Sequence, residues 1–213
     1  MNDFDQVCQH IDDMLAELVG NGVRLTLATK TVPQEMLRKV ADRYPDLCFG
    51  ENRQQELASK WFAPSGRWRF IGRLQRNKVK FLVGQVGMIE SVDSLELARE
   101  IDRQAAKHDL IMPILVEVNL GEEQKGGVPY EEAQSLVDSV SSLPNVRLEG
   151  LMVVLPQEGA EQAAAKTKRI YDELKAKYPL HVLSMGMSGD YEIALRYGST
   201  ELRLGSKIFG QRS

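Results

Sequence analysis

Eight short runs of apolar, β-branched and aromatic residues alternate with helical patterns along this chain, and this alternation constrains the fold more than any other feature. The runs cover residues 25–29, 47–50, 67–71, 87–92, 111–118, 146–154, 182–185 and 201–204. Strands that alternate with helices pair in parallel through right-handed crossovers. Eight such β/α units predict a single (β/α)₈ TIM barrel of the α/β class.

A further helix is predicted before the first strand, over residues 3–19. Its apolar residues Val7, Ile11, Met14, Leu15 and Leu18 share one face, which is typical of a helix that packs on a core. No linker or low-complexity segment divides the chain, so we expect one domain over residues 1–213. An open, doubly wound sheet is the alternative, although no G-x-G-x-x-G follows the first strand.

Composition excludes several classes of function. The net charge of −3 argues against a general electrostatic grip on nucleic acid. No apolar run reaches the roughly 18 residues of a membrane helix, and the polar start of the chain does not resemble a signal peptide. The two cysteines, Cys8 and Cys48, fit no metal site, and they favour a reducing, cytoplasmic location. We interpret Cys48 as a small buried apolar residue and assign no role to Cys8.

Polar and glycine residues gather just after the predicted strands. In barrels of this kind the carboxyl ends of the strands form the active site. Lys30 follows the first strand, and a lysine removed from water becomes a nucleophile toward carbonyl groups. A solvated surface charge is the alternative interpretation of Lys30 on its own.

The segments after the seventh and eighth strands are the usual phosphate site of this fold. They carry small residues that expose backbone N–H groups, which are Ser184, Gly186, Ser188, Gly205 and Ser206. Plain turns are the alternative. A lysine facing a phosphate cradle predicts a phosphorylated carbonyl ligand, and both pyridoxal 5′-phosphate (PLP) and a sugar phosphate fit.

Arg203 bears on the choice between these ligands. PLP proteins place either an acidic residue or an arginine at the pyridine nitrogen, and an arginine only donates hydrogen bonds. Arg203 would therefore hold that nitrogen in its neutral, accepting form. A salt bridge to Glu201 or to a neighbouring helix is the alternative for Arg203.

A set of motifs from residue 25 to residue 212 resembles the YggS-type family of pyridoxal phosphate homeostasis proteins, which is related to the N-terminal barrel of alanine racemase. The matching stretches are Ala28 to Thr31, Phe49 to Asn52 with Gln55 and Glu56, Trp68 to Gly72 with Leu74, Gln75, Asn77 and Lys78, Lys125 with Gly127, Gly150 to Met152, Leu183 to Ser188 with Asp190, Gly198 to Thr200, Leu202 to Gly205, and Ile208 to Gly210 with Arg212.

The resemblance implies a role for each candidate site residue. Lys30 would carry PLP as a Schiff base, Arg203 would meet the pyridine nitrogen, and Asn52 would lie beneath the ring. The residues implied around the phosphate are Ser184, Ser188, Gly205 and Ser206. The family is thought to bind PLP and hand it over, which keeps the free aldehyde low. The resemblance implies no established turnover and a monomer. We expect PLP-dependent apoenzymes as recipients and no metal site.

The chain departs from the family pattern at a few positions. Arg53 stands where the family usually has tyrosine, Arg69 replaces the usual histidine, and residues 122–126 form a variant loop. We expect all three departures to lie on the rim of the barrel, where they would affect ligand access or partner docking.

Three functional hypotheses remain open from the residues. A PLP carrier is favoured over an amino-acid racemase and over a cofactor-free Schiff-base aldolase. A racemase needs an acid/base on each face of the substrate carbon, and in alanine racemase a tyrosine of a second domain supplies one of them. We expect this chain to lack such a domain. The aldolase needs no pyridine partner, so Arg203 and the resemblance disfavour it.

Overall fold

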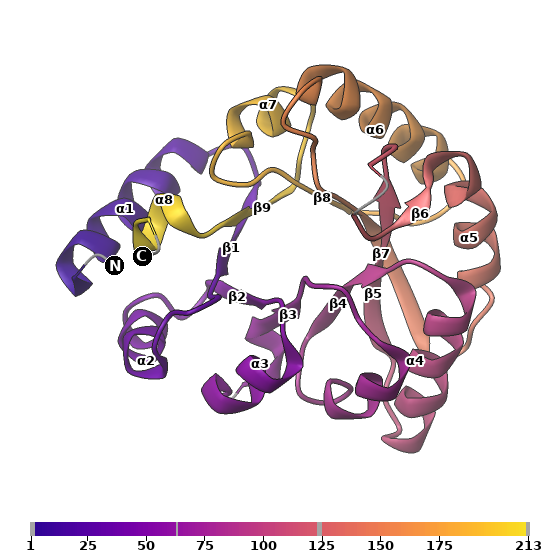
Figure 1. The fold of residues 1–213 in the computed structure, drawn as a ribbon, viewed down its shortest axis with the longest axis horizontal. Helices are drawn as coiled ribbons and strands as arrows, with labels where there is room; N and C mark the ends of the chain where they lie inside the picture. Colours follow the sequence, from indigo (N-terminus) through magenta and orange to yellow (C-terminus); the bar gives the residue numbers. More distant parts are fainter. Residues whose placement is uncertain (1–2, 63, 123–124, 212–213) are drawn as a thin grey trace.

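The computed structural model describes residues 3–62, 64–122 and 125–211, and in that part of the chain parallel strands close into a barrel (Figure 1). The barrel strands are β1 (Arg24–Ala28), β2 (Cys48–Glu51), β3 (Trp68–Phe70), β4 (Met88–Val92), β5 (Met112–Asn119), β7 (Val146–Val153), β8 (Val182–Met185) and β9 (Glu201–Leu204). Each pairs with the next in that order, and β9 pairs with β1. The predicted eight-stranded barrel is confirmed, and the open sheet is excluded.

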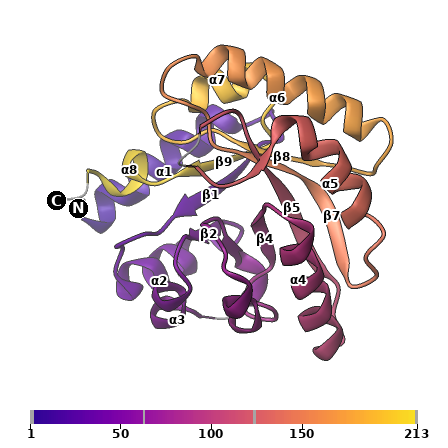
Figure 2. The ribbon, with the colours of Figure 1, turned by 45° about the vertical axis from the view of Figure 1, so that its right-hand side comes forward.

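Helices surround the barrel on its outside, as Figures 1 and 2 show. They are α2 (Gln34–Arg43), α3 (Gln54–Lys60), α4 (Leu95–Lys107), α5 (Ala133–Val140), α6 (Ala160–Lys175), α7 (Tyr191–Arg196) and α8 (Ser206–Phe209), with 3₁₀ helices η1 (Ser65–Arg67), η2 (Arg76–Phe81) and η3 (Tyr130–Glu132). η3 leads directly into α5. The sequence analysis did not predict β6 (Val128–Pro129), which pairs with the end of β5.

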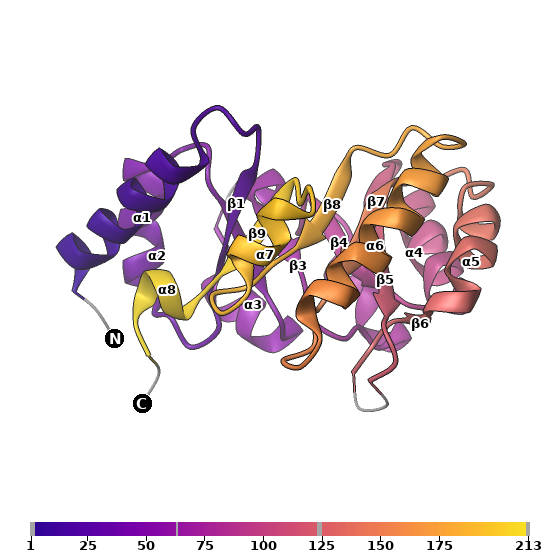
Figure 3. The same ribbon diagram turned by 90° about the horizontal axis from the view of Figure 1, so that it is seen from above.

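The predicted extra helix is present as α1 (Phe4–Leu18), which lies beside α8 in Figures 1 and 3. Asp3 and Gln6 form a capping box at its start. The final helix α8 has only 4 residues, too few to cover the strands next to it. α1 supplies the missing cover, and its His10 Nδ1 lies 3.0 Å from the Ile208 carbonyl oxygen of α8.

Two different environments make up the core. Between barrel and helices the core is apolar, and the rings of Phe49, Phe62 and Trp68 pack there with centroids 5.2–5.4 Å apart. Inside the barrel, an apolar cluster of Met88, Leu115, Met152 and Val182 occupies only part of the space. The other buried side chains include Thr26, Glu90, Ser184, Glu201 and Arg203. Buried polar groups of this kind need partners, and those partners orient the functional site.

The helices of the barrel bear on whether the chain could span a lipid bilayer. Within the described residues, none is both long enough and apolar enough to cross a membrane.

Candidate functional site

A cavity of about 670 Å³ opens at the carboxyl ends of the strands, and we call it the mouth cavity. Its lining includes most of the residues singled out from the sequence, which are Lys30, Asn52, Ser188, Arg203, Gly205 and Ser206. These residues follow or end strands β1, β2, β8 and β9, and they therefore meet at one end of the barrel.

Lys30 lies two residues beyond the end of β1 and is exposed. The sequence suggested that the protein shields Lys30 from water. The structure shows that the surrounding residues do not. The next residue, Thr31, has φ of 64°, a left-handed conformation that is strained for a β-branched residue. Such a backbone persists only where surrounding contacts hold it.

A buried ionic cluster supplies those contacts on both sides of Lys30. Lys60 Nζ donates to the Thr29 carbonyl oxygen at 2.8 Å and to Glu51 Oε2 at 3.2 Å. It also donates to Glu56 Oε1 at 2.5 Å. Glu56 Oε1 in turn accepts the Thr31 backbone N–H. We call Glu51, Glu56 and Lys60 the Lys60 cluster; it fixes the direction in which the chain leaves β1.

The charge of Glu56 is stabilised within this cluster. Burial raises its pKa, but the hydrogen bonds from Lys60 and from the Thr31 N–H outweigh that effect and hold the pKa below its ordinary value. The acceptor that holds Thr31 is therefore an ionised carboxylate at neutral pH, which makes a stronger hydrogen bond than a neutral group would.

The guanidinium of Arg203 is held from inside the barrel. Nη1 donates to Ser184 Oγ at 2.7 Å, and Nη2 donates to the Val153 carbonyl oxygen at 2.8 Å. The alternative salt bridge to Glu201 is not formed; Glu201 instead pairs with Arg24 and Arg69. Because a guanidinium has five N–H donors, Arg203 keeps donors for a ligand in the mouth cavity.

Ser184 lies apart from the other predicted phosphate residues. Its side chain is fully buried in the barrel and does not line the mouth cavity. Its hydroxyl donates to Glu90 Oε2 at 2.7 Å and accepts from Arg203. The structure thus places Ser184 where it orients Arg203, away from the cradle that the sequence analysis assigned to it.

Backbone N–H groups gather at the start of α8, where Ser188, Gly205 and Ser206 line the mouth cavity. The hydroxyl of Ser188 accepts the Gly205 N–H at 3.3 Å and the Lys207 N–H at 3.1 Å, at the start of α8. The first N–H groups of a helix have no partner within the helix, and here the Ser188 side chain accepts two of them, so a phosphate would share these donors with the hydroxyl or displace it. This arrangement of Ser188, Gly205 and Ser206 can cradle a phosphate group.

The position of Asn52 depends on a glycine in the neighbouring loop. A Cβ atom on Gly72 would lie 2.2 Å from the Asn52 carbonyl oxygen, so no other residue fits there without moving the backbone. The Asn52 N–H also donates to Glu51 Oε1 at 2.9 Å. The close approach of the chain after β3 explains why glycine ends the Trp68 to Gly72 motif.

Glu117, near the end of β5, is a further polar residue of the barrel to which the sequence assigned no role. Its side chain is buried, and burial together with the charge of Asp93 raises its pKa to about 7. Deeper in the barrel, burial and Glu201 raise the pKa of Glu90 to about 8. A single glutamate within the apolar run 111–118 was the available signal for Glu117.

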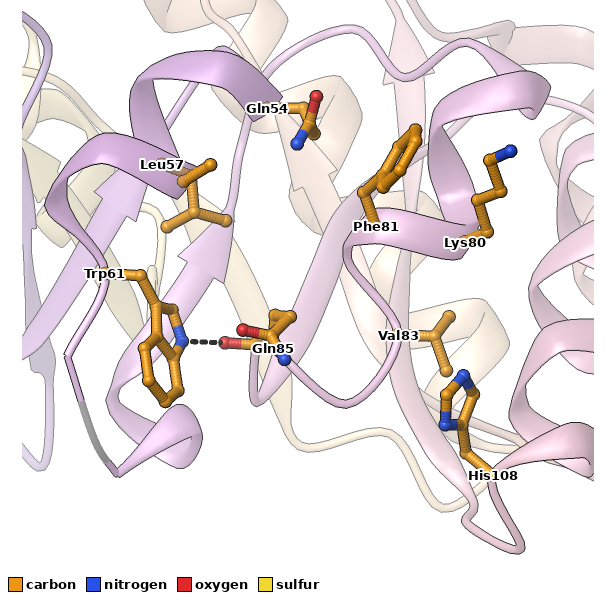
Figure 4. Close-up of a pocket in the computed structure, with 9 residues that line it drawn as sticks. Gln54, Leu57, Trp61, Lys80, Phe81, Val83, Gln85 and His108 are labelled. Carbon is orange, nitrogen blue, oxygen red and sulfur yellow. Dashed lines mark hydrogen bonds between the residues drawn. The ribbon is translucent and has the colours of Figure 1, made fainter.

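A different cavity, of about 320 Å³, lies outside the barrel and is drawn in Figure 4. Leu57, Trp61 and Phe81 contribute to its lining, and Trp61 Nε1 donates to the Gln85 carbonyl oxygen at 2.7 Å. It contains none of the predicted site residues, so the mouth cavity is the candidate site.

Comparison with known proteins identifies the family. The model of the family described as "Alanine racemase, N-terminal domain" matches residues 34–213. The chain belongs to this family. The pyridoxal phosphate homeostasis protein of Aquifex aeolicus is 41% identical over 202 residues, which cover 90% of this chain and 88% of the relative. The protein of the same name from Escherichia coli K12 is 32% identical and covers 89% and 86%.

Solved structures of this family agree with the fold. PipY of Synechococcus elongatus PCC7942, solved without PLP, is 29% identical and superimposes with a TM-score of 0.88 over 96% of this chain and 100% of PipY. The PLP-bound structure of PipY is 28% identical, with a TM-score of 0.84 over the same shares of the two chains. The resemblance to pyridoxal phosphate homeostasis proteins found in the sequence is confirmed.

The departures from the family pattern do not all lie where we expected them. Arg53 does lie on the rim, where it lines a cavity of about 530 Å³ with Arg73, Gln75 and Lys78. Arg69 lies at the other end of the barrel, in a cavity that also contains Arg24. The expectation for Arg69 was wrong, because β3 begins at Trp68 and places Arg69 near the amino ends of the strands. Residues 123–124 of the variant loop, and Arg212, lie outside the described residues.

The cysteines and possible metal ligands add no further chemistry. Cys8 is buried on α1 and packs in the core, while Cys48 is only partly buried. Burial raises the pKa of the Cys48 thiol, which keeps it in its unreactive form. The described residues contain no group of histidine, cysteine and acidic side chains able to hold a metal ion.

Replacing Lys60 with methionine tests the Lys60 cluster. Lys60→Met leaves Glu51 and Glu56 without their buried counter-ion, and we expect the free energy of unfolding to fall by about 3–5 kcal/mol. The matched control is Lys39→Met, which breaks an exposed pair with Glu35 and should cost less than about 1 kcal/mol. Urea denaturation measures both. Equal losses would show that the cluster does not fix the chain around Lys30.

The pH dependence of stability tests Glu117. Its pKa is raised from 4.5 in the unfolded chain to about 7 in the folded protein. The folded protein therefore binds more protons between these values, and stability falls as pH rises through that window. Glu117→Gln should flatten this slope by up to about 1.4 kcal/mol per pH unit. Urea denaturation from pH 5 to pH 7 checks it, with exposed Glu96→Gln as control. Parallel profiles for the parent and Glu117→Gln would refute the assignment.

Proposed function

We propose that this chain binds PLP as a Schiff base on Lys30 and holds it for delivery, as a vitamin B6 homeostasis protein without catalytic turnover. The observation that carries the proposal is the mouth cavity, which brings together Lys30, Arg203 and the backbone donors at Gly205. Relatives named pyridoxal phosphate homeostasis protein support it, as does PipY with PLP bound. We infer that residues 1–213 act as one domain in this role.

The residues of the mouth cavity fit the chemical parts of PLP. Lys30 supplies the amine, and the donors around Ser188, Gly205 and Ser206 suit the phosphate. Arg203 suits the pyridine nitrogen, since it donates and does not release a proton. Asn52 lines the mouth cavity as well as the cavity of about 530 Å³ beside it, and it would contact the ring. When bound, PLP supplies an aldehyde for the amine and an electron-withdrawing ring.

Ser184 has a positioning role in this proposal. It accepts from Arg203 and donates to Glu90, so it fixes the plane of the guanidinium that meets the ring. An arginine at the ring nitrogen works against a protonated pyridine, because it only donates hydrogen bonds. Because carbanion chemistry on PLP relies on the ring as an electron sink, this arrangement favours storage over turnover.

A racemase needs a second acid/base, and the described residues that line the mouth cavity include no histidine, tyrosine or acidic side chain. The histidines lie elsewhere: His10 contacts α8 from α1, His108 lines the outer cavity of Figure 4, and His181 lies at the amino ends of the strands. A positioned acid/base contributes about 10² to 10⁴ in rate. We therefore propose PLP-dependent apoenzymes as recipients of a bound cofactor rather than amino acids as substrates.

Reductive labelling tests the role of Lys30. Purified protein loaded with PLP should absorb visible light, and borohydride should fix a pyridoxyl group on Lys30 that mass spectrometry locates. Lys30→Ala should fold and stay colourless, whereas Lys78→Ala, at the neighbouring rim cavity, should keep the colour. A pyridoxyl group found solely on Lys78 or Lys125 would contradict the proposal.

Comparison of PLP with pyridoxal tests the phosphate cradle. Two charge-assisted hydrogen bonds at about 1.5 kcal/mol each predict that PLP binds about 100-fold more tightly than pyridoxal. Gly205→Val should crowd the phosphate and remove most of that difference, while Gly66→Val, in open space away from the cavity, should not. Fluorescence titration gives the affinities. Equal affinity of the parent protein for both ligands would rule out the cradle.

A further inference from the structure

The cavity that contains Arg24 and Arg69 has a volume of about 460 Å³ and lies at the amino ends of the strands, and we call it the amino-end cavity. Its lining includes Arg24, Arg69, Arg147, Glu149 and His181. Arg24 is the first residue of β1 and Arg147 the second of β7, so the cavity lies at the end of the barrel opposite Lys30. No residue is shared with the mouth cavity.

Two arginines and the histidine of this cavity face outward, and the carboxylates lie behind them. The side chains of Arg24, Arg147 and His181 are 52%, 59% and 67% exposed, whereas those of Glu201 and Glu149 are 1% and 11% exposed. Glu201 pairs with Arg24, and Glu149 pairs with Arg147 and lies 3.3 Å from His181 Nε2. A ligand entering the cavity therefore meets Arg24, Arg147 and His181 before the carboxylates.

Arg69 adds a further cation, whose ion pair with Glu201 is long, at 3.9 Å, and includes no hydrogen bond from Nε. It is 8% exposed, and within the described part of the chain its guanidinium makes one hydrogen bond, from Nη1 to the Gly66 carbonyl oxygen at 3.3 Å. Its Nε has no hydrogen-bond partner, and Glu201 Oε1 lies 3.9 Å away, where it already accepts from Thr26. A buried arginine with unused donors is costly unless an anion completes it.

The charges around the cavity leave a positive excess. Three arginines share two carboxylates, Glu149 and Glu201. The next carboxyl inward is Glu90, whose pKa burial and Glu201 raise to about 8, so it is mostly neutral at pH 7. The excess positive charge and the unused donors of Arg69 therefore both favour the binding of an anion.

We propose that the amino-end cavity binds a small phosphate-bearing anion, at a site separate from the PLP site. Arginines on β1, β3 and β7 approach the cavity from different sides of the barrel. A tetrahedral phosphate presents oxygens in several directions and matches such donors, whereas a planar carboxylate presents two. The proposal does not depend on PLP binding at Lys30.

The chain offers a local probe, because His181 lines this cavity while the two other histidines, His10 and His108, lie elsewhere. Inorganic phosphate is titrated into the full-length, PLP-saturated protein at constant pH, with ionic strength matched by chloride, and the histidine ring signals are followed by NMR. We expect a saturable shift of the His181 signal with no matching shift of His10 or His108. Because the His181 signal reports on the amino-end cavity, the test is valid whether or not the mouth cavity is occupied.

Variants separate a built site from charge screening. Arg69→Gln should weaken phosphate binding by about tenfold or more, and Arg147→Gln, at an exposed side chain, gives the same test if Arg69→Gln fails to fold. Exposed Arg99→Gln on α4 is the matched control and should leave binding unchanged. A linear His181 shift, an equal shift of all three histidines, or equal binding by Arg147→Gln and Arg99→Gln would overturn the proposal. Equally tight binding of malonate would overturn the preference for phosphate.

Discussion

The pairing of β1 with β9 is the contact on which the rest of the site depends. It joins the first strand of the barrel to the last, with Thr26 opposite Arg203 and Leu27 opposite Leu204. Side chains of successive residues in a strand point to opposite faces of the sheet. A shift of the β1–β9 pairing by one residue would therefore turn Arg203 out of the barrel. The closed register thus places Lys30 beyond one strand and Arg203 at the end of its neighbour, on one cavity.

Buried polar groups then set the direction of each functional side chain. Lys60 holds the backbone on either side of Lys30 through Thr29 and Glu56, and Glu90 acts on Arg203 through Ser184. Such groups are costly to bury, and they remain stable only because each has partners in a fixed geometry. The same interior separates the mouth cavity from the amino-end cavity, so one barrel presents two polar cavities at its two ends.

Particular residues show how far the sequence could predict this arrangement. The apolar runs located all eight barrel strands, because burial of a strand on both faces leaves a clear pattern. The short β6 and the 3₁₀ helix η3 carry too few residues for such a pattern. Arg69 was placed on the wrong end because β3 has only 3 residues, and its start decides which end of the barrel a side chain reaches.

The sequence by itself determined the barrel, the lysine after the first strand, the glycines and serines after the last two, and membership of the family. Local pattern suffices for these features, because periodicity and motif spacing are properties of neighbouring residues. Only the tertiary structure decided that Ser184 faces Arg203 inside the barrel, that Glu201 pairs with Arg24, and that Lys30 stays exposed. Those contacts join residues far apart in the chain, and they arise only once strand register and barrel closure choose which side chains meet.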